Sequence, residues 1–151
     1  MRKIVFLMAL LSSLAFANSE LERQCNNGNA GSCGALGDLY RYGYGVKQDY
    51  KKASEFYGKA CEMGVAKSCS KLGGLYQYGL GVKQDYKKAN ELFGKSCEMG
   101  YANGCVLLGF LYQYGEGVRK DYNKAMEFFG KACDLGEQKG CDAYKEIKLN
   151  P

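Results

Sequence analysis

The chain has 151 residues with 21 Lys and Arg, 16 Asp and Glu, eight cysteines and no histidine, which gives a formal net charge of +5. The absence of histidine excludes imidazole metal sites and Ser-His or Cys-His nucleophiles. The charge is modest and the signature motifs of RNA-binding and zinc-finger domains are missing, so we do not expect the chain to bind nucleic acid.

Residues 1–17 have the features of a secretory signal peptide. Two basic residues precede an apolar run over residues 4–11, and an A-x-A-like cleavage site ends at Ala17. The apolar run is too short to span a bilayer as a helix, and no later segment is apolar enough to do so. We therefore predict a signal peptide at 1–17 and a secreted or periplasmic chain at 18–151 without a membrane span.

The rest of the sequence repeats itself with a period of 36 residues. Each copy contains an L-G step, a tyrosine, a G-x-G-V segment and a D-Y-x-K-A-like segment, in the same register. The copies of the first two features are Leu36-Gly37, Leu72-Gly73 and Leu108-Gly109, and Tyr40, Tyr76 and Tyr112. Repetition at this period predicts a solenoid built from one repeated unit.

The unit itself reads as a pair of antiparallel helices. Leucine and tyrosine at helical spacing mark one face of a first helix that ends at Gly43. A second helix begins at Asp49, whose carboxylate is suited to an N-cap, and ends near Gly64. Glycine inside a helix costs about 1 kcal/mol relative to alanine, so Gly37 and its copies predict a close helix contact, for which we expect Ala53 and its copies to be the partners.

The cysteines form a C-x7-C pair that also recurs every 36 residues. An even number at regular spacing indicates a disulfide framework formed in an oxidising compartment. Zinc is a weaker explanation, because histidine and C-x2-C elements are absent. Bridges that closed each hairpin would leave two cysteines unpaired, whereas pairing across eight residues leaves none. The predicted bridges are Cys25–Cys33, Cys61–Cys69, Cys97–Cys105 and Cys133–Cys141.

The run L-G-x-L-Y-x-x-G-x-G-V-x-x-D-Y-x-K-A, followed by the cysteine pair, resembles the Sel1-like repeat. With a bridge in each unit, the chain is similar to the secreted cysteine-rich Sel1-repeat proteins of Helicobacter and related bacteria. This resemblance implies an all-α, right-handed superhelix of αα-hairpins related to tetratricopeptide repeats. Three complete hairpins would follow a helical stub near residues 19–25 and be closed by a polar capping helix at 138–148.

The same resemblance implies penicillin binding or a weak β-lactamase activity. Serine β-lactamases use S-x-x-K, in which the lysine takes the proton of the serine one turn before it. Ser68 and Lys71 fit this spacing, and they are the candidate catalytic residues. The S-D-N and K-T-G elements are absent, and the other repeats have Ala35 and Leu107 at the position of Lys71.

Solenoids of paired helices present a groove lined by the first helix of each pair to extended ligands. Variable positions after the L-G step are expected to face this groove. They are Asp38, Arg41, Tyr42, Gly74, Gln77, Tyr78, Phe110, Gln113 and Tyr114. The two hypotheses are therefore a scaffold that binds a peptide, a partner protein or a peptidoglycan stem, and a β-lactam hydrolase; neither requires a cofactor or metal.

Overall fold

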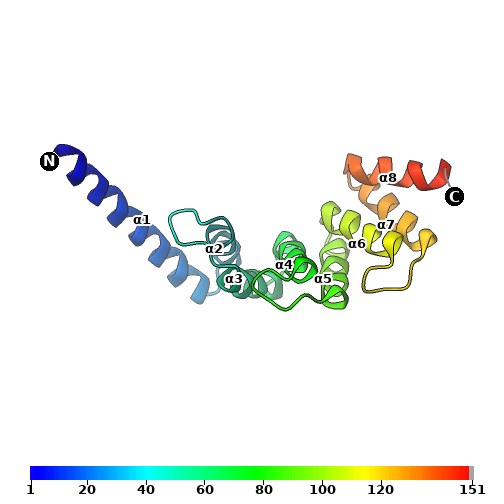
Figure 1. Cartoon of the computed structure of the whole chain (residues 1–151), viewed down its shortest axis with the longest axis horizontal. Helices are drawn as coiled ribbons and strands as arrows, with labels where there is room; N and C mark the ends of the chain where they lie inside the picture. The colour runs from blue at the N-terminus through cyan, green and yellow to red at the C-terminus, as the bar shows by residue number, and fades with distance from the viewer. Residues whose placement is uncertain (150–151) are drawn as a thin grey trace.

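The computed structural model describes residues 1–149, except for the side chain of Leu11. These residues form eight α-helices and no strand, as the sequence predicts. The helices succeed one another in an arc, and α1 extends away from it at one end (Figure 1). Their bounds are α1 Arg2–Asn26, α2 Ala30–Tyr42, α3 Tyr50–Glu62, α4 Ala66–Tyr78, α5 Tyr86–Glu98, α6 Ala102–Tyr114, α7 Tyr122–Asp134 and α8 Gln138–Leu149.

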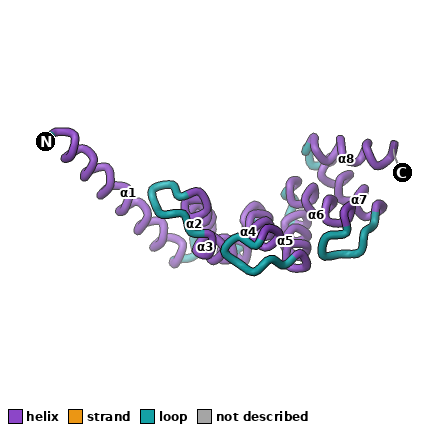
Figure 2. The backbone as a smooth tube through the Cα atoms, in the orientation of Figure 1, coloured by secondary structure: helices purple, strands orange, loops and turns teal. Residues whose placement is uncertain are grey.

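Three hairpins, α2–α3, α4–α5 and α6–α7, form the body, and a long loop joins the helices of each pair (Figure 2). Gly43 ends α2 in the left-handed conformation with φ of 70°, where glycine carries no steric cost. The Asp49 side chain accepts a hydrogen bond from the backbone N–H of Lys52 at 3.0 Å and begins α3. Both predicted helix boundaries are therefore confirmed.

The glycines of the L-G step let the two helices of each hairpin pack closely. A Cβ atom added at Gly73 would lie 2.7 Å from the ring of Phe93, and one added at Gly109 would lie 2.6 Å from the ring of Phe129. Our expectation that Ala53 and its copies fill this role was wrong. The aromatic ring one turn further along the second helix lies over each glycine.

Three disulfides join the end of a hairpin to the start of the next helix, and the first joins α1 to α2. All four predicted pairs are formed, with Cα–Cα distances of 4.6 to 4.8 Å, and none of the cysteines is free. All eight cysteines lie within the described residues. The repeats are thus linked covalently along the array, whose right-handed sense stays a prediction.

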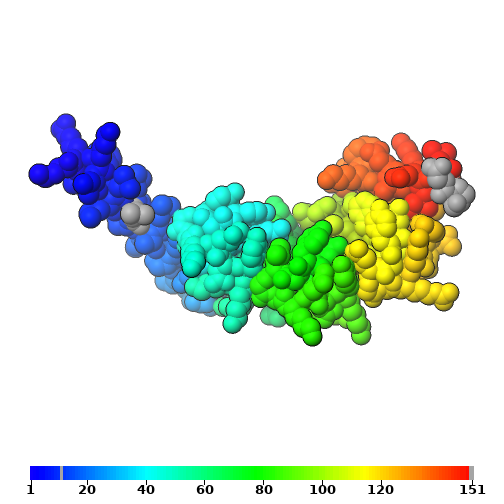
Figure 3. Space-filling view, in the orientation of Figure 1, coloured from blue at the N-terminus to red at the C-terminus, as the bar shows by residue number. Residues whose placement is uncertain are grey.

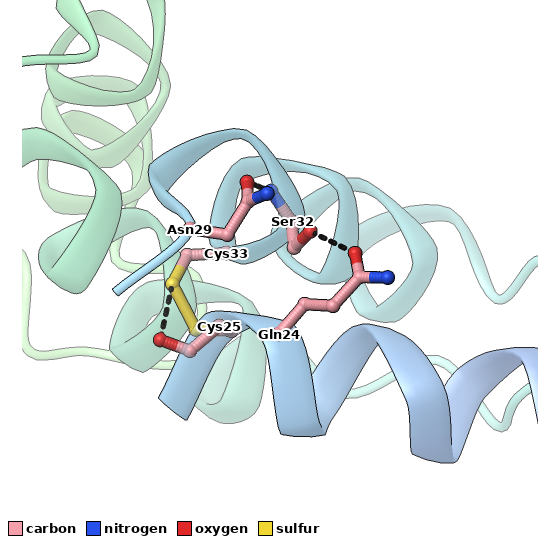
Figure 4. Close-up of a disulfide and its surroundings, with 5 residues drawn as sticks. All are labelled: Gln24, Cys25, Asn29, Ser32 and Cys33. Carbon is pink, nitrogen blue, oxygen red and sulfur yellow. Dashed lines mark hydrogen bonds between the residues drawn. A yellow bond between two sulfur atoms is a disulfide. The ribbon is translucent and has the colours of Figure 1, made fainter. Parts of the chain in front are cut away.

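The first bridge has additional polar contacts around it (Figure 4). The Ser32 hydroxyl donates a hydrogen bond to Oε1 of Gln24 at 2.8 Å. The backbone N–H of Ser32 donates to Oδ1 of Asn29 at 2.9 Å, which caps α2. These bonds, together with the Cys25–Cys33 bridge, fix the end of α1 against the first hairpin.

Helix α1 is longer than the predicted stub, since it runs without interruption from Arg2 to Asn26. Its first part projects from the continuous surface of the repeats (Figure 3) and exposes large side chains such as Phe6 and Phe16, each 73% exposed. By length and composition it is the one helix of the described residues that could cross a membrane. The length argument against a span considered residues 4–11 only and does not hold for the whole helix. A signal sequence passes the same test, and the division at residue 17 stays a prediction.

The array is closed by α8, which matches the predicted capping helix and extends to Leu149. Ala143 and Ile147 are buried against the preceding hairpin. The charged residues of α8 lie on its exposed side. The last repeat therefore has a polar outer surface, as solenoid ends require.

Candidate functional site

A cavity of about 270 Å³ opens on the groove face, which we define as the face formed by α2, α4 and α6. Its walls come from all three hairpins, so no single repeat contains it. It is lined by Arg41, Tyr42, Ser70, Lys71, Gly74, Gln77, Tyr78, Phe93, Tyr101, Asn103 and Leu107. We refer to it as the central cavity.

Five of the predicted groove residues line this cavity. They are Arg41, Tyr42, Gly74, Gln77 and Tyr78. The two tyrosines are 50% and 69% exposed, so they are available to a ligand, whereas Tyr40 two residues earlier is 9% exposed and belongs to the core. In the first repeat the second tyrosine is therefore the more accessible of the two.

Helix ends hold the residues at the rim of the central cavity. Tyr42 and Tyr78 are the last residues of α2 and α4, because a left-handed glycine stops each helix immediately afterwards. The Arg41 guanidinium lies 5.4 Å from the centroid of the Tyr42 ring. Gln77 donates a hydrogen bond from Nε2 to Oε2 of Glu116 at 3.3 Å, which connects the rim to the loop of the third hairpin.

Asp38 lies beside the cavity and connects its wall to the core. Its Oδ1 atom accepts a hydrogen bond from the Tyr57 hydroxyl at 2.6 Å and another from Lys71 Nζ, with which it forms an ion pair. Burial, and secondarily the hydrogen bond to Asp38, raises the pKa of Tyr57 above its ordinary value. Lys71 Nζ also lies 5.5 Å from the centroid of the Tyr57 ring. The positive charge of Lys71 is therefore compensated inside the protein.

The other three predicted groove residues lie outside the central cavity, on the third hairpin. Phe110 stacks on Tyr114 at a centroid distance of 6.1 Å and meets Phe129 edge-on at 5.0 Å. Oε1 of Gln113 is buried and has no hydrogen-bond partner among the described residues. This part of the groove face is thus an aromatic surface rather than a cavity.

Sequence reasoning missed the contributions of Ser70, Phe93, Tyr101, Asn103 and Leu107 to the cavity. Tyr101 and Asn103 belong to the start of the third hairpin and reach back across the repeat boundary. A signal for Ser70 was present, because Gly34 and Val106 stand at its position in the other repeats. A comparison of the repeats position by position would have identified Ser70 as a residue that differs from both of its counterparts.

The candidate catalytic pair is not arranged for nucleophilic attack. Ser68 is 3% exposed, and its hydroxyl oxygen lies 3.1 Å from where a Cβ of Gly34 would be. Lys71 directs its amine to Asp38. A nucleophile must reach its substrate and its base, and neither condition is met here. Within residues 1–149 no group of three His, Cys, Asp or Glu side chains could hold a metal ion.

Comparison with protein families assigns the fold. A family model described as Sel1 repeat matches residues 30–65, 66–101 and 102–137. The chain belongs to the Sel1 repeat family. The three matched segments correspond to the three hairpins together with the loops that follow them.

Solved structures agree with this assignment. A protective antigen of uropathogenic Escherichia coli that displays an SLR fold is 30% identical with a TM-score of 0.82, and the match covers 86% of this chain and 28% of that chain. A Sel1 repeat protein from Oxalobacter formigenes is 29% identical with a TM-score of 0.70, over 74% of this chain and 45% of that chain. The present chain therefore spans less than half the length of either protein.

A Helicobacter pylori protein, cysteine-rich protein B, is similar over nearly its whole length. It is 29% identical with a TM-score of 0.69, and the match covers 87% of this chain and 95% of that chain. A comparison with curated proteins gave no match. The four disulfides and this cysteine-rich neighbour indicate that the Sel1-repeat chain folds outside the cytoplasm.

Proposed function

We propose that this Sel1-repeat protein is a secreted or periplasmic scaffold that binds an extended peptide on its groove face. The peptide would belong to a partner protein or to a peptidoglycan stem. The central cavity supports this proposal, because it gathers exposed Tyr42 and Tyr78 with Arg41 and Gln77 at one point of the face. Tyrosine and arginine are the side chains that dominate binding energy at interfaces.

The rigidity of the array favours binding at this position. Association costs free energy when loops and side chains must be ordered, and a preorganised surface reduces that cost. The walls of the cavity are formed mainly by helices. The Cys61–Cys69 and Cys97–Cys105 bridges link the hairpins to which these helices belong. The scaffold therefore presents its rim residues with little rearrangement.

β-Lactam hydrolysis, the second hypothesis, has no support from the geometry of Ser68 and Lys71. We expect no turnover of a chromogenic cephalosporin by the oxidised protein, and the same result for Ser68→Ala. Turnover that Ser68→Ala abolishes would overturn this expectation and establish a serine hydrolase.

Peptide binding can be tested with Tyr78→Ala. The probes are a pool of synthetic hexapeptides and a pool of peptidoglycan stem peptides, measured by retention on immobilised protein. We expect Tyr78→Ala to weaken retention about ten-fold or more, as for a hot-spot residue. The matched control is Tyr122→Ala, which removes a 46% exposed tyrosine from the second helix of a hairpin, away from the central cavity. Equal losses in both variants, or no retention by the parent protein, would contradict the proposal.

A further inference from the structure

Three residues of the second repeat that line the central cavity stand at positions where all three repeats differ from one another. At three positions in register, the second repeat has residues of a different kind from both neighbours. They are Ser70, Lys71 and Gly74, against Gly34, Ala35 and Asp38 in the first repeat and Val106, Leu107 and Phe110 in the third. All three residues of the second repeat line the cavity, so the change in sequence and the opening in the surface coincide.

Gly74 forms an open part of the cavity wall. A Cβ added to it would have no heavy atom within 4 Å. At the corresponding place in the third repeat, the Phe110 ring packs against Tyr114 and Phe129. The second repeat leaves open a volume that the third repeat fills with its own side chain. The space beside Gly74 is therefore accessible to a ligand side chain.

Ser70 supplies an unused polar group in the same wall. The residue is 4% exposed. Its hydroxyl has no hydrogen-bond partner among residues 1–149, but it is not one of the fully buried side-chain atoms left without a partner there. Because Ser70 lines the cavity, a polar atom of a ligand there can pair with this hydroxyl.

The charged residues that line the cavity are both basic, while the carboxylates of Asp38 and Glu116 contact lining residues from outside it. Arg41 and Lys71 are its charged lining residues, and no carboxylate lines it. Lys71 is compensated by Asp38, but Arg41 is not. The ion pairs within the described part of the chain are Arg23–Glu20 and Lys71–Asp38, so the Arg41 guanidinium is unpaired. Guanidinium groups bind carboxylates through two parallel hydrogen bonds, which are stronger than neutral ones.

We infer that the central cavity is a subsite for a carboxylate and the side chain that accompanies it. The carboxylate would pair with Arg41, the adjoining side chain would enter the space over Gly74, and a polar atom of the ligand would pair with Ser70. The carboxylate is the C-terminus of the bound peptide or an Asp or Glu side chain within it. This inference rests on the proposed peptide binding and specifies which peptides bind.

The size of the cavity fits one residue. Sites for small-molecule ligands usually enclose about 300 to 1,000 Å³, whereas the central cavity has about 270 Å³ and is open to the groove face. The rest of an extended peptide would continue along the groove face, past Tyr42 and Tyr78. Affinity would then come from the groove, and selectivity from the cavity.

The test uses the oxidised full chain and three hexapeptide pools of random sequence. One pool has free C-termini, the second has the same sequences amidated, and the third has free C-termini but contains no Asp or Glu. We expect amidation to weaken retention about ten-fold if the cavity binds the C-terminus, with the third pool unaffected. If it binds an acidic side chain, the third pool is weakened and amidation has little effect. Ten-fold corresponds to about 1.4 kcal/mol.

Two variants assign the effect to the cavity. Arg41→Gln should remove the preference for the carboxylate while the residual retention remains. Gly74→Phe copies the third repeat and should block the cavity, and a Cβ at this position meets no heavy atom within 4 Å. The control Arg119→Gln removes an exposed arginine from the loop of the third hairpin and should change nothing. Thermal unfolding of each variant verifies that the fold is intact.

Each outcome has one meaning. A carboxylate preference that Arg41→Gln removes and Arg119→Gln leaves supports the inference. Equal retention of all three pools overturns the inference and leaves the proposed peptide binding standing. A preference that persists in both Arg41→Gln and Gly74→Phe places the carboxylate elsewhere and also overturns it. No retention of any pool overturns the proposed function together with the subsite.

Discussion

The second and third repeats have the same core but different groove surfaces. In both, the glycine of the L-G step packs under an aromatic ring of the second helix, Gly73 under Phe93 and Gly109 under Phe129. One residue later, the second repeat has Gly74 beside an open cavity and the third has Phe110, which fills the space with its ring. Positions that repeat build the scaffold, and positions that do not repeat distinguish its surfaces.

This division has a physical cause. Every hairpin packs on its neighbours through the same pair of interfaces, so a change at a core position would have to be accommodated by the adjacent repeats. A groove-face residue such as Tyr78 is largely exposed to solvent. It can therefore change in one repeat without destabilising the others.

The largest expected effect comes from breaking the scaffold at a bridge. Replacing both Cys61 and Cys69 by alanine should lower the free energy of unfolding by about 2 to 3 kcal/mol, from the loop entropy of the unfolded chain. Urea denaturation of the parent and the variant measures this difference in the free energy of unfolding. The matched variant replaces Cys133 and Cys141, which have the same separation of 8 residues, and loop entropy predicts the same loss. A much larger loss for the central pair would show that its bridge also holds adjacent repeats in contact.

A smaller loss is expected from the core glycine of the second repeat. The methyl group of Gly73→Ala would meet the ring of Phe93, and overpacking typically costs about 1 to 3 kcal/mol. The better helix propensity of alanine returns up to about 1 kcal/mol. We therefore expect a net loss of about 1 to 2 kcal/mol in urea denaturation. A stability unchanged from the parent would mean that Phe93 moves aside without cost, and that the close packing is incidental.

Much of the scaffold could be predicted from the sequence because it is determined locally. The disulfide pairs, the Asp49 cap and the left-handed Gly43 depend on residues that are near one another in the chain. The partner of Gly37 could not be predicted, because spacing along a helix does not determine how far two helices slide past each other. The ring of Tyr57, one turn beyond Ala53, proved to be the contact.

The site was predicted in part for a related reason. Arg41 and Tyr78 were identified because they follow the L-G step on the same kind of helix. Tyr101 and Asn103 were missed because they approach the cavity from the next hairpin, and their distance from the second hairpin depends on how the repeats stack. The length of α1 was also underestimated, since the prediction considered the apolar run and the stub as separate segments.

A third prediction concerns the pH dependence of the core contact between Tyr57 and Asp38. Burial raises the pKa of Tyr57 in the folded protein, while the unfolded chain keeps a value near 10. The stability from the neutral hydroxyl is therefore complete below about pH 10 and is lost as pH rises above it. Tyr57→Phe should cost about 1 kcal/mol at pH 8, through loss of the hydrogen bond to Asp38.

The measurement compares urea midpoints at pH 8 and at about pH 10.5. The difference in stability between the parent and Tyr57→Phe should shrink at the higher pH. Only the parent has a hydroxyl at this position that ionises in the unfolded chain and stays neutral in the folded protein. Tyr78→Phe is the control, since Tyr78 is 69% exposed and lies on the groove face. A gap between the parent and Tyr57→Phe that stays constant with pH would contradict a raised pKa of Tyr57 in the folded protein.

The smallest expected change in stability is at Gly74, and it gives the most direct comparison between a core position and a groove position. A Cβ at Gly74 meets nothing within 4 Å, so Gly74→Ala should gain about 0.5 to 1 kcal/mol from helix propensity. The adjacent change Gly73→Ala should lose stability, although the two substitutions are chemically identical and lie in the same helix. Differential urea denaturation of the two variants measures both signs. A loss of stability at Gly74 would mean that the space beside it closes in solution, and the central cavity would then be too small to admit a ligand side chain.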